Sequence, residues 1–173
     1  MLTIFRIILV PITLIYLIDG SYFNALVAFT LAGITDALDG LLARVLNQKT
    51  ILGAYMDPVA DKALLTSCFI ALAILGIIPG WLTAIVITRD FIILFGIFIL
   101  FMVSGSLEIR PAFISKITTT LQLLTVFLVL GHRTWGGEGH PLLIYVLYWL
   151  TAGFTIASGF HYISRGIKIF NHT

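Results

Sequence analysis

Six long apolar runs constrain this chain more than any other feature of its sequence. They are separated by short polar or Gly/Pro-containing stretches and cover residues 4–18, 22–46, 52–78, 81–103, 113–130 and 142–163. A helix needs about 20 apolar residues to cross a hydrocarbon layer of about 30 Å, because each residue adds about 1.5 Å. The sequence therefore predicts an all-α, polytopic integral membrane protein with six transmembrane helices.

The first run is the shortest and contains Arg6 and Pro11. Pro11 removes a helical hydrogen bond and favours a bend, so we expect the chain to begin as a short interfacial helix that continues into the first span. The apolar pattern continues without a small-residue cleavage site, which disfavours a signal peptide. No stretch is long enough for a separate soluble domain, and residues 1–173 are expected to form one membrane domain.

Composition agrees with an exterior that faces lipid. The chain is 60% hydrophobic and 10% charged, whereas soluble domains are about 45–50% apolar and about 25% charged. Its formal net charge is only +2, a weak field for a polyanion, which argues against nucleic-acid binding. Its single cysteine excludes an intrachain disulfide.

Basic residues gather at one set of expected helix ends. The N-terminus, the loops near 45–52 and 104–112 and the C-terminus contain or adjoin Arg6, Arg44, Lys49, Arg110, Lys116, Arg165 and Lys168. The opposite set of ends holds only Arg133. By the positive-inside rule, both termini are expected on the cytoplasmic side of the membrane.

Four aspartates fall inside the second and third runs. Asp36 and Asp39 are three residues apart and Asp57 and Asp61 are four apart, so each pair shares one face of a helix. The short polar stretch 47–50 joins the two runs, and we expect antiparallel neighbours whose four carboxylates converge near the cytoplasmic surface. Ionisable groups at this depth are costly and indicate function. An all-oxygen set of ligands suits Mg²⁺ or Mn²⁺.

The spacing of the aspartates alone also fits two different roles. Asp39, Arg44 and Lys62 could neutralise one another in a purely structural network, or the carboxylates could relay protons or divalent cations in a transporter. The surroundings favour a diphosphate ligand, because Arg44 can clamp a phosphate with two hydrogen bonds. Small residues that let a bulky ligand approach flank the acidic pairs, namely Gly40, Ala43 and Gly53.

The complete pattern resembles a known family signature. Asp36-x2-Asp39-Gly40-x2-Ala43-Arg44-x8-Gly53-x3-Asp57-x3-Asp61 matches that of the CDP-alcohol phosphatidyltransferases without a gap or substitution. The resemblance extends over the chain, through Leu2-Thr3-x2-Arg6-x4-Pro11, Lys116-x2-Thr119-x2-Gln122 and Ser158-Gly159-x2-Tyr162. The run Asp57-Pro58-Val59-Ala60-Asp61-Lys62 is most similar to the bacterial phosphatidylglycerophosphate synthase branch. The start departs from the family, because it lacks the Asn that usually precedes Leu2-Thr3.

The resemblance implies a reaction and its participants. CDP-diacylglycerol would donate a phosphatidyl group to an alcohol, first of all glycerol 3-phosphate, with release of CMP. Two divalent ions, Mg²⁺ or Mn²⁺, would be held by Asp36, Asp39, Asp57 and Asp61, and Asp61 would take the proton of the acceptor. The CDP-diacylglycerol site would comprise Asp36, Asp39, Gly40, Ala43, Arg44, Gly53 and Asp57. A homodimer in a bacterial inner membrane, with the active site facing the cytoplasm, is also implied.

Binding of an acceptor phosphate requires positive charge, for which Arg89, Lys116 and Arg110 are the candidates. Arg89 is the sharpest, because it lies within an apolar run beside Asp90. Consecutive helix residues point apart, so we expect Arg89 to be available to a ligand rather than paired with Asp90. Simpler roles are a structural Arg89–Asp90 pair, a snorkelling anchor for Lys116 and a purely topological charge for Arg110.

A second acceptor stays open. Many phosphatidylglycerophosphate synthases have Arg-Glu where this chain has Arg89-Asp90. Arg-Asp together with Ser115-Lys116-x2-Thr119-x2-Gln122 is similar to the related cardiolipin synthases, which use phosphatidylglycerol as acceptor. The transporter alternative is disfavoured, because all four aspartates of the pattern lie in two adjacent runs, whereas transporters often have repeated halves.

Overall fold

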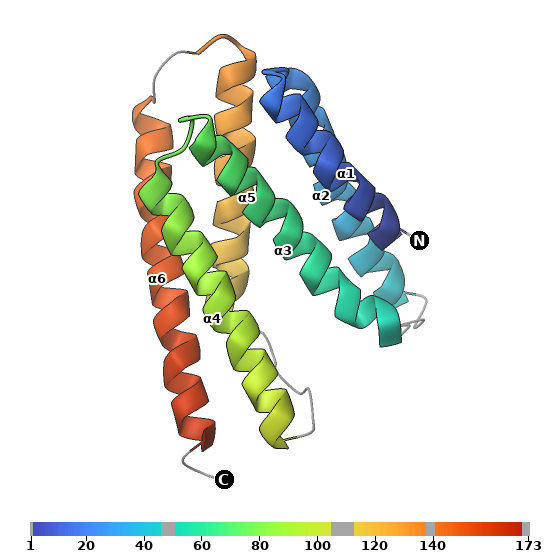
Figure 1. The fold of residues 1–173 in the computed structure, drawn as a ribbon, viewed down its shortest axis with the longest axis vertical. Coiled ribbons are helices and arrows are strands. Elements are labelled where there is room, and N and C mark those ends of the chain that lie inside the picture. The colour runs from blue at the N-terminus through green and yellow to red at the C-terminus, as the bar shows by residue number, and fades with distance from the viewer. Residues whose placement is uncertain (1, 46–50, 105–112, 138–140, 171–173) are drawn as a thin grey trace. The chain divides into compact units, whose positions relative to one another are not determined.

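The computed structural model describes the backbone of residues 2–45, 51–104, 113–137 and 141–170, and most side chains within 8–35, 62–96, 114–137 and 141–164. Within these residues the chain forms six helices and no strand (Figure 1). The helices are α1 (Leu2–Ile18), α2 (Tyr22–Val45), α3 (Ile51–Ile74), α4 (Gly80–Ser104), α5 (Phe113–Thr134) and α6 (Leu142–Phe170). The all-α class and the order of the six predicted helices are confirmed.

Helix α3 ends at Ile74, four residues before the end of its apolar run. Gly76 has a φ of 68° and reverses the chain. The N–H of Ile77 donates to the carbonyl of Leu72 (2.8 Å) and that of Gly76 to the carbonyl of Ala73 (3.0 Å). These two bonds form a Schellman cap, which satisfies carbonyls that the helix leaves free. Turn chemistry rather than hydrophobicity therefore fixes this end of the helix.

Helix α1 continues through Pro11 without interruption. It begins at Leu2, so the described part of the chain contains no separate helix before it. The interfacial segment expected to precede or begin the first span stays a prediction.

The helices belong to two compact units. Unit 1 comprises Met1–Pro79 with Val126–Gly139, and unit 2 comprises Gly80–Thr125 with His140–Thr173. In unit 1, α1 contacts α2 and α3. Ala25, Ala28 and Ala32 are buried at spacings of three and four along α2, so one face of this helix is made of small residues that permit close helix packing.

The interiors of the two units differ in polarity. Among the described side chains, Thr13 is the one buried polar residue of unit 1. In unit 2, where α4 contacts α6, the buried polar side chains are Thr83, Arg89, Asp90, Thr118, Gln122, Thr125, Thr151, Thr155 and Ser158. Unit 2 therefore contains a polar interior within helices of apolar sequence.

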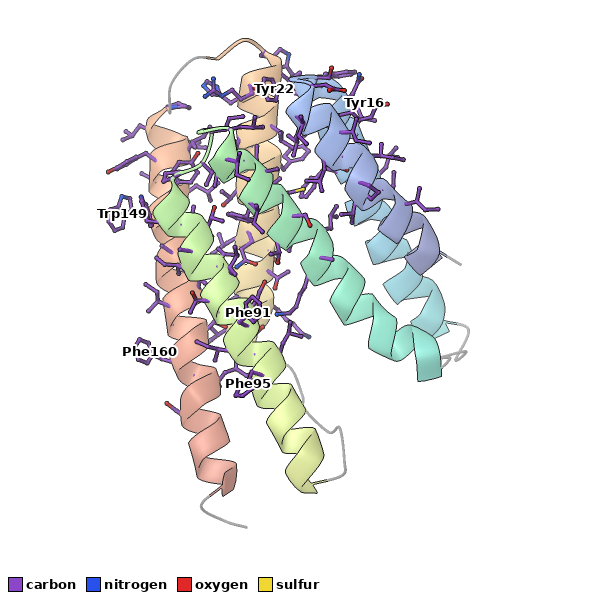
Figure 2. All side chains as sticks on the ribbon, in the orientation of Figure 1. Tyr16, Tyr22, Phe91, Phe95, Trp149 and Phe160 are labelled. Atoms are coloured by element: carbon purple, nitrogen blue, oxygen red, sulfur yellow. The ribbon has the colours of Figure 1, made fainter. Side chains whose placement is uncertain are left out.

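The exterior of unit 2 is apolar where the interior is polar. Phe91 and Phe95 on α4 are 68% and 66% exposed, and Trp149 and Phe160 on α6 are 58% and 68% exposed (Figure 2). Large exposed apolar side chains are unfavourable in water when they are contiguous. In the described residues, the stretches Ile114–Thr134 and Leu142–Tyr162 are long and apolar enough to cross a membrane.

Candidate functional site

Arg89 lies in the middle of α4 and is 4% exposed. Its Nη1 donates to Oδ1 of Asp90 at 2.7 Å, and both side chains of this ion pair are buried. A charged pair in a low-dielectric interior is stable only if its hydrogen-bonding groups are satisfied. The contacts of the remaining guanidinium nitrogens therefore determine whether Arg89 can also bind a ligand.

Two serines hold the opposite edge of the guanidinium group. Nη2 of Arg89 donates to Oγ of Ser115 on α5 at 2.6 Å. Nη2 and Nε also donate to Oγ of Ser158 on α6, at 3.2 and 3.4 Å. Three helices thus converge on one side chain, and the serines fix its plane without adding charge.

The expectation that Arg89 and Asp90 point apart is wrong, because the structure pairs them. The long arginine side chain can curve back to its neighbour, which the geometry of the helix backbone alone does not reveal. Burial also strengthens the attraction, because Coulomb energies grow as the effective dielectric constant falls. The formal charges of the two side chains offset each other.

The contacts of the guanidinium group leave room for one more acceptor atom. It has five N–H groups, and the four contacts to Asp90, Ser115 and Ser158 use one hydrogen of Nη1, that of Nε and both of Nη2. The second Nη1 hydrogen makes no hydrogen bond to the described residues. A phosphate oxygen could accept this hydrogen, and could take the place of the Asp90 carboxylate on Nη1 as well.

Of the other two predicted acceptor residues, Lys116 has a described side chain and Arg110 does not. Lys116 follows Ser115 along α5, but its side chain is exposed and makes no hydrogen bond or ion pair with the described residues. Arg110 falls within 105–112, outside the described residues. Their roles stay predictions.

The predicted metal ligands lie on helical backbone. Asp36 and Asp39 belong to the last part of α2, and Asp57 and Asp61 to the first part of α3. The helical spacing therefore holds, and each pair shares one face. Figure 1 shows that these two helix ends lie at the same end of unit 1. The four side chains lie outside the described ones, so their convergence stays a prediction.

The residues expected around the nucleotide lie on the same helix segments. Gly40, Ala43 and Arg44 are in α2, and Gly53 is in the first turn of α3. Their side-chain surroundings also lie outside the described part of the chain. Four carboxylates would supply a hard, all-oxygen set of ligands, a donor chemistry that fits Mg²⁺ or Mn²⁺.

Ser115 and Ser158 are partners of Arg89 that helical spacing in the sequence does not identify. Both serines stand in segments that carry the family resemblance, beside Lys116 and Gly159. Their contacts with Arg89 span 26 and 69 residues along the chain. The motifs could have marked the two serines as functional residues. Nothing in the local sequence, however, indicates that these distant segments contact Arg89.

Comparison with known proteins gives relatives with two different acceptors. A probable cardiolipin synthase (CMP-forming) of Drosophila melanogaster is 34% identical over 94% of this chain and 55% of its own length. The cardiolipin synthase (CMP-forming) of Homo sapiens is 32% identical over 97% of this chain and 61% of its own. The CDP-diacylglycerol–glycerol-3-phosphate 3-phosphatidyltransferase of Bacillus subtilis is 29% identical over 95% and 92%.

The chain thus spans about three-fifths of the length of the cardiolipin synthases that it matches. The sequence profile of the CDP-alcohol phosphatidyltransferase family matches residues 1–157, which include the whole acidic pattern of α2 and α3 and the Arg89 cluster except Ser158. The resemblance seen in the sequence is therefore confirmed, and this chain belongs to the CDP-alcohol phosphatidyltransferase family.

Proposed function

We propose that this chain transfers a phosphatidyl group from CDP-diacylglycerol to the hydroxyl group of a phosphate-bearing alcohol, with release of CMP. The single observation that carries the proposal is the intact acidic pattern, from Asp36 to Asp61, in a member of this family. The helical backbone at all four aspartates supports it, because the pattern requires each pair to share a helix face.

The protein works within a membrane in this proposal, with all six helices as spans and both termini and the active site on the cytoplasmic side. An apolar exterior around a polar interior in unit 2 supports a lipid environment. The distribution of basic residues supports the orientation. The bacterial inner membrane and a homodimeric state follow from the family resemblance alone.

The donor is held at the cytoplasmic ends of α2 and α3. Asp36, Asp39, Asp57 and Asp61 would hold two divalent ions, Mg²⁺ or Mn²⁺. When bound, these ions would neutralise the diphosphate and the departing CMP. Arg44 would contact the diphosphate with its planar guanidinium group. The small residues Gly40, Ala43 and Gly53 would leave space for the cytidine diphosphate.

The transfer step requires one base. Asp61 takes the proton from the hydroxyl of the acceptor, so that its oxygen can attack the lipid-bearing phosphorus of the donor. A new P–O bond forms to the acceptor, and the bond from this phosphorus to the oxygen of CMP breaks. The electron pair of that bond leaves with CMP.

Arg89 binds the phosphate of the acceptor, and we propose phosphatidylglycerol as this acceptor, with cardiolipin as product. Two observations favour it over glycerol 3-phosphate. Asp90 and Ser115, which belong to the resemblance to cardiolipin synthases, contact Arg89 directly. An arginine already paired with Asp90 also suits the single charge of a phosphodiester better than the dianion of a phosphomonoester.

Glycerol 3-phosphate, the acceptor that the sequence first favoured, remains the second candidate. The Bacillus subtilis relative is named for it, and this chain covers 92% of that protein. A probable phosphatidylglycerophosphate synthase of Mycobacterium tuberculosis is 41% identical over 51% of this chain. Both acceptors carry a phosphate and a primary hydroxyl group, so the metal motif serves either.

An acceptor competition tests the proposal. Purified protein in mixed micelles receives CDP-diacylglycerol, Mn²⁺ and equal amounts of phosphatidylglycerol and glycerol 3-phosphate, and the lipid products are identified by mass spectrometry. We expect cardiolipin as the main product. Formation of phosphatidylglycerophosphate alone would reject phosphatidylglycerol as acceptor, and the absence of both lipids would reject the transferase activity.

A further inference from the structure

The polar interior of unit 2 extends along α5 and α6 beyond Arg89. Its members recur every three or four residues on each helix, so each set occupies one helix face. They are Ser115, Thr118, Gln122 and Thr125 on α5, and Thr151, Thr155 and Ser158 on α6. Thr118 Oγ1 lies 3.1 Å from the carbonyl oxygen of Phe154, and the hydroxyls of Thr125 and Thr151 are 2.9 Å apart. These contacts join the two rows.

Gln122 differs from the threonines around it. Its side chain is 1% exposed, and its Nε2 has no hydrogen-bond partner among the described residues. The hydroxyls of Thr118, Thr125 and Thr155, in contrast, donate to backbone carbonyls of their own helices. A buried amide without a partner is unfavourable, and such groups are rare in native proteins. This donor can serve an oxygen atom that the described chain does not supply.

Gln122 lies on the same face of α5 as Ser115, the residue of this helix that contacts Arg89. It stands two turns after Ser115 on the same face of α5, a rise of about 10.5 Å. Side chains of a helix generally lean toward its N-terminus. For Gln122 this is the direction of Ser115, whose Oγ accepts a hydrogen bond from Arg89 at 2.6 Å. A ligand whose anion lies on Arg89 could therefore reach the amide of Gln122 with a neutral oxygen.

We propose that Nε2 of Gln122 donates a hydrogen bond to the secondary hydroxyl of the glycerol group of the acceptor. This inference rests on the proposed function. The phosphate of the acceptor lies on Arg89, and its primary hydroxyl must face the phosphorus of the donor. The secondary hydroxyl is then the one group of the glycerol phosphate moiety without a role, and in a buried site it needs a partner. This moiety is common to phosphatidylglycerol and glycerol 3-phosphate.

Acceptors that lack the secondary hydroxyl test the proposal. Phosphatidylglycerol is compared with phosphatidyl-1,3-propanediol, and glycerol 3-phosphate with 3-hydroxypropyl phosphate, in the wild type and in Gln122→Met. In the wild type, loss of this hydroxyl should raise the KM of the active acceptor roughly tenfold. In Gln122→Met, the two members of the pair should have similar KM values, with the KM of CDP-diacylglycerol unchanged.

A matched control separates binding from packing. Thr125→Val removes a buried hydroxyl three residues further along α5 and should keep the tenfold difference between the two acceptors. If Gln122→Met keeps this difference too, the proposal is wrong. If that variant does not fold, equal KM values for both acceptors in the wild type overturn the proposal by themselves. The absence of CMP release from the wild type with every acceptor would instead refute the proposed function.

Discussion

The hydroxyl of Ser158 on α6 accepts two hydrogen bonds from the Arg89 guanidinium group on α4, at 3.2 and 3.4 Å. Ser158 is fully buried and carries no charge. It therefore orients the arginine without competing for an anion, whereas Asp90 neutralises it. The acceptor site that we propose depends on both effects, the orientation of Arg89 by Ser158 and its neutralisation by Asp90.

Replacing Ser158 by Ala should weaken acceptor binding. The guanidinium group would lose both bonds to α6 and gain freedom, so we expect the KM of the acceptor to rise about three- to tenfold. The KM of CDP-diacylglycerol should not change. Ser158→Thr, which keeps a hydroxyl group, should recover part of the lost acceptor binding. Ser164→Ala is the control, because Ser164 is exposed and bonds to the carbonyl of Phe160. Equal effects of both alanine variants would contradict a positioning role for Ser158.

Removal of Arg89 should destabilise the fold as well as the activity. Arg89→Met takes away the guanidinium group that pairs at 2.7 Å with the Asp90 carboxylate, whose side chain is 7% exposed. Breaking one side of a buried ion pair costs about 3–5 kcal/mol of unfolding free energy. Arg89→Met combined with Asp90→Asn should recover most of this stability but none of the acceptor binding. Thermal unfolding in detergent measures the first effect and acceptor KM the second. A fully stable single variant would contradict this account of the pair.

The helices were predictable because long apolar runs with turn residues between them leave few alternatives. The run of residues 22–46 ends one residue after α2 does. The run 81–103 begins one residue after α4 begins and ends one residue before α4 ends. The end of α3 was not predictable from hydrophobicity, since Ile77 and Ile78 are buried although they follow the helix. The positive φ of Gly76 determines where this helix ends.

Gly76→Ala should destabilise the protein by about 1–2 kcal/mol, because an L-residue strains at a φ of 68°. Apart from Gly76 and its two chain neighbours, no atom of the described residues lies within 4 Å of an added Cβ, so the cause is the backbone conformation. Gly153→Ala is the matched control. Gly153 lies within α6 with equal space around it, and there alanine should be neutral or stabilising. The change in unfolding temperature of each variant checks this, and equal changes would contradict it.

The site was less predictable than the helices. The acidic pattern could be read from the sequence because its members lie three or four residues apart on single helices. The Arg89 cluster could not, because it joins residues from three helices, and because the flexible arginine side chain pairs with its own neighbour Asp90. Residue spacing along one helix predicts neither the meeting of three helices nor the pairing of Arg89 with Asp90.

The roles of two aspartates should separate experimentally. Asp61→Asn removes the base, and because Asp36, Asp39 and Asp57 would still hold the metal ions, it should abolish turnover while CDP-diacylglycerol still binds. Asp39→Asn removes a metal ligand and should lose Mn²⁺ and donor binding together. Binding of the donor to detergent-solubilised protein, measured with and without Mn²⁺, distinguishes the two. Equal donor affinity in both variants would refute this assignment of roles.

Release of CMP tests the central claim most directly. Wild-type protein reconstituted in vesicles receives CDP-diacylglycerol and Mn²⁺, and CMP is measured with and without phosphatidylglycerol or glycerol 3-phosphate. We predict CMP release that requires one of these acceptors, equals the phospholipid product mole for mole, and stops when a chelator removes the metal. Failure to release CMP with either acceptor, in protein that is folded and loaded with metal, would contradict phosphatidyl transfer.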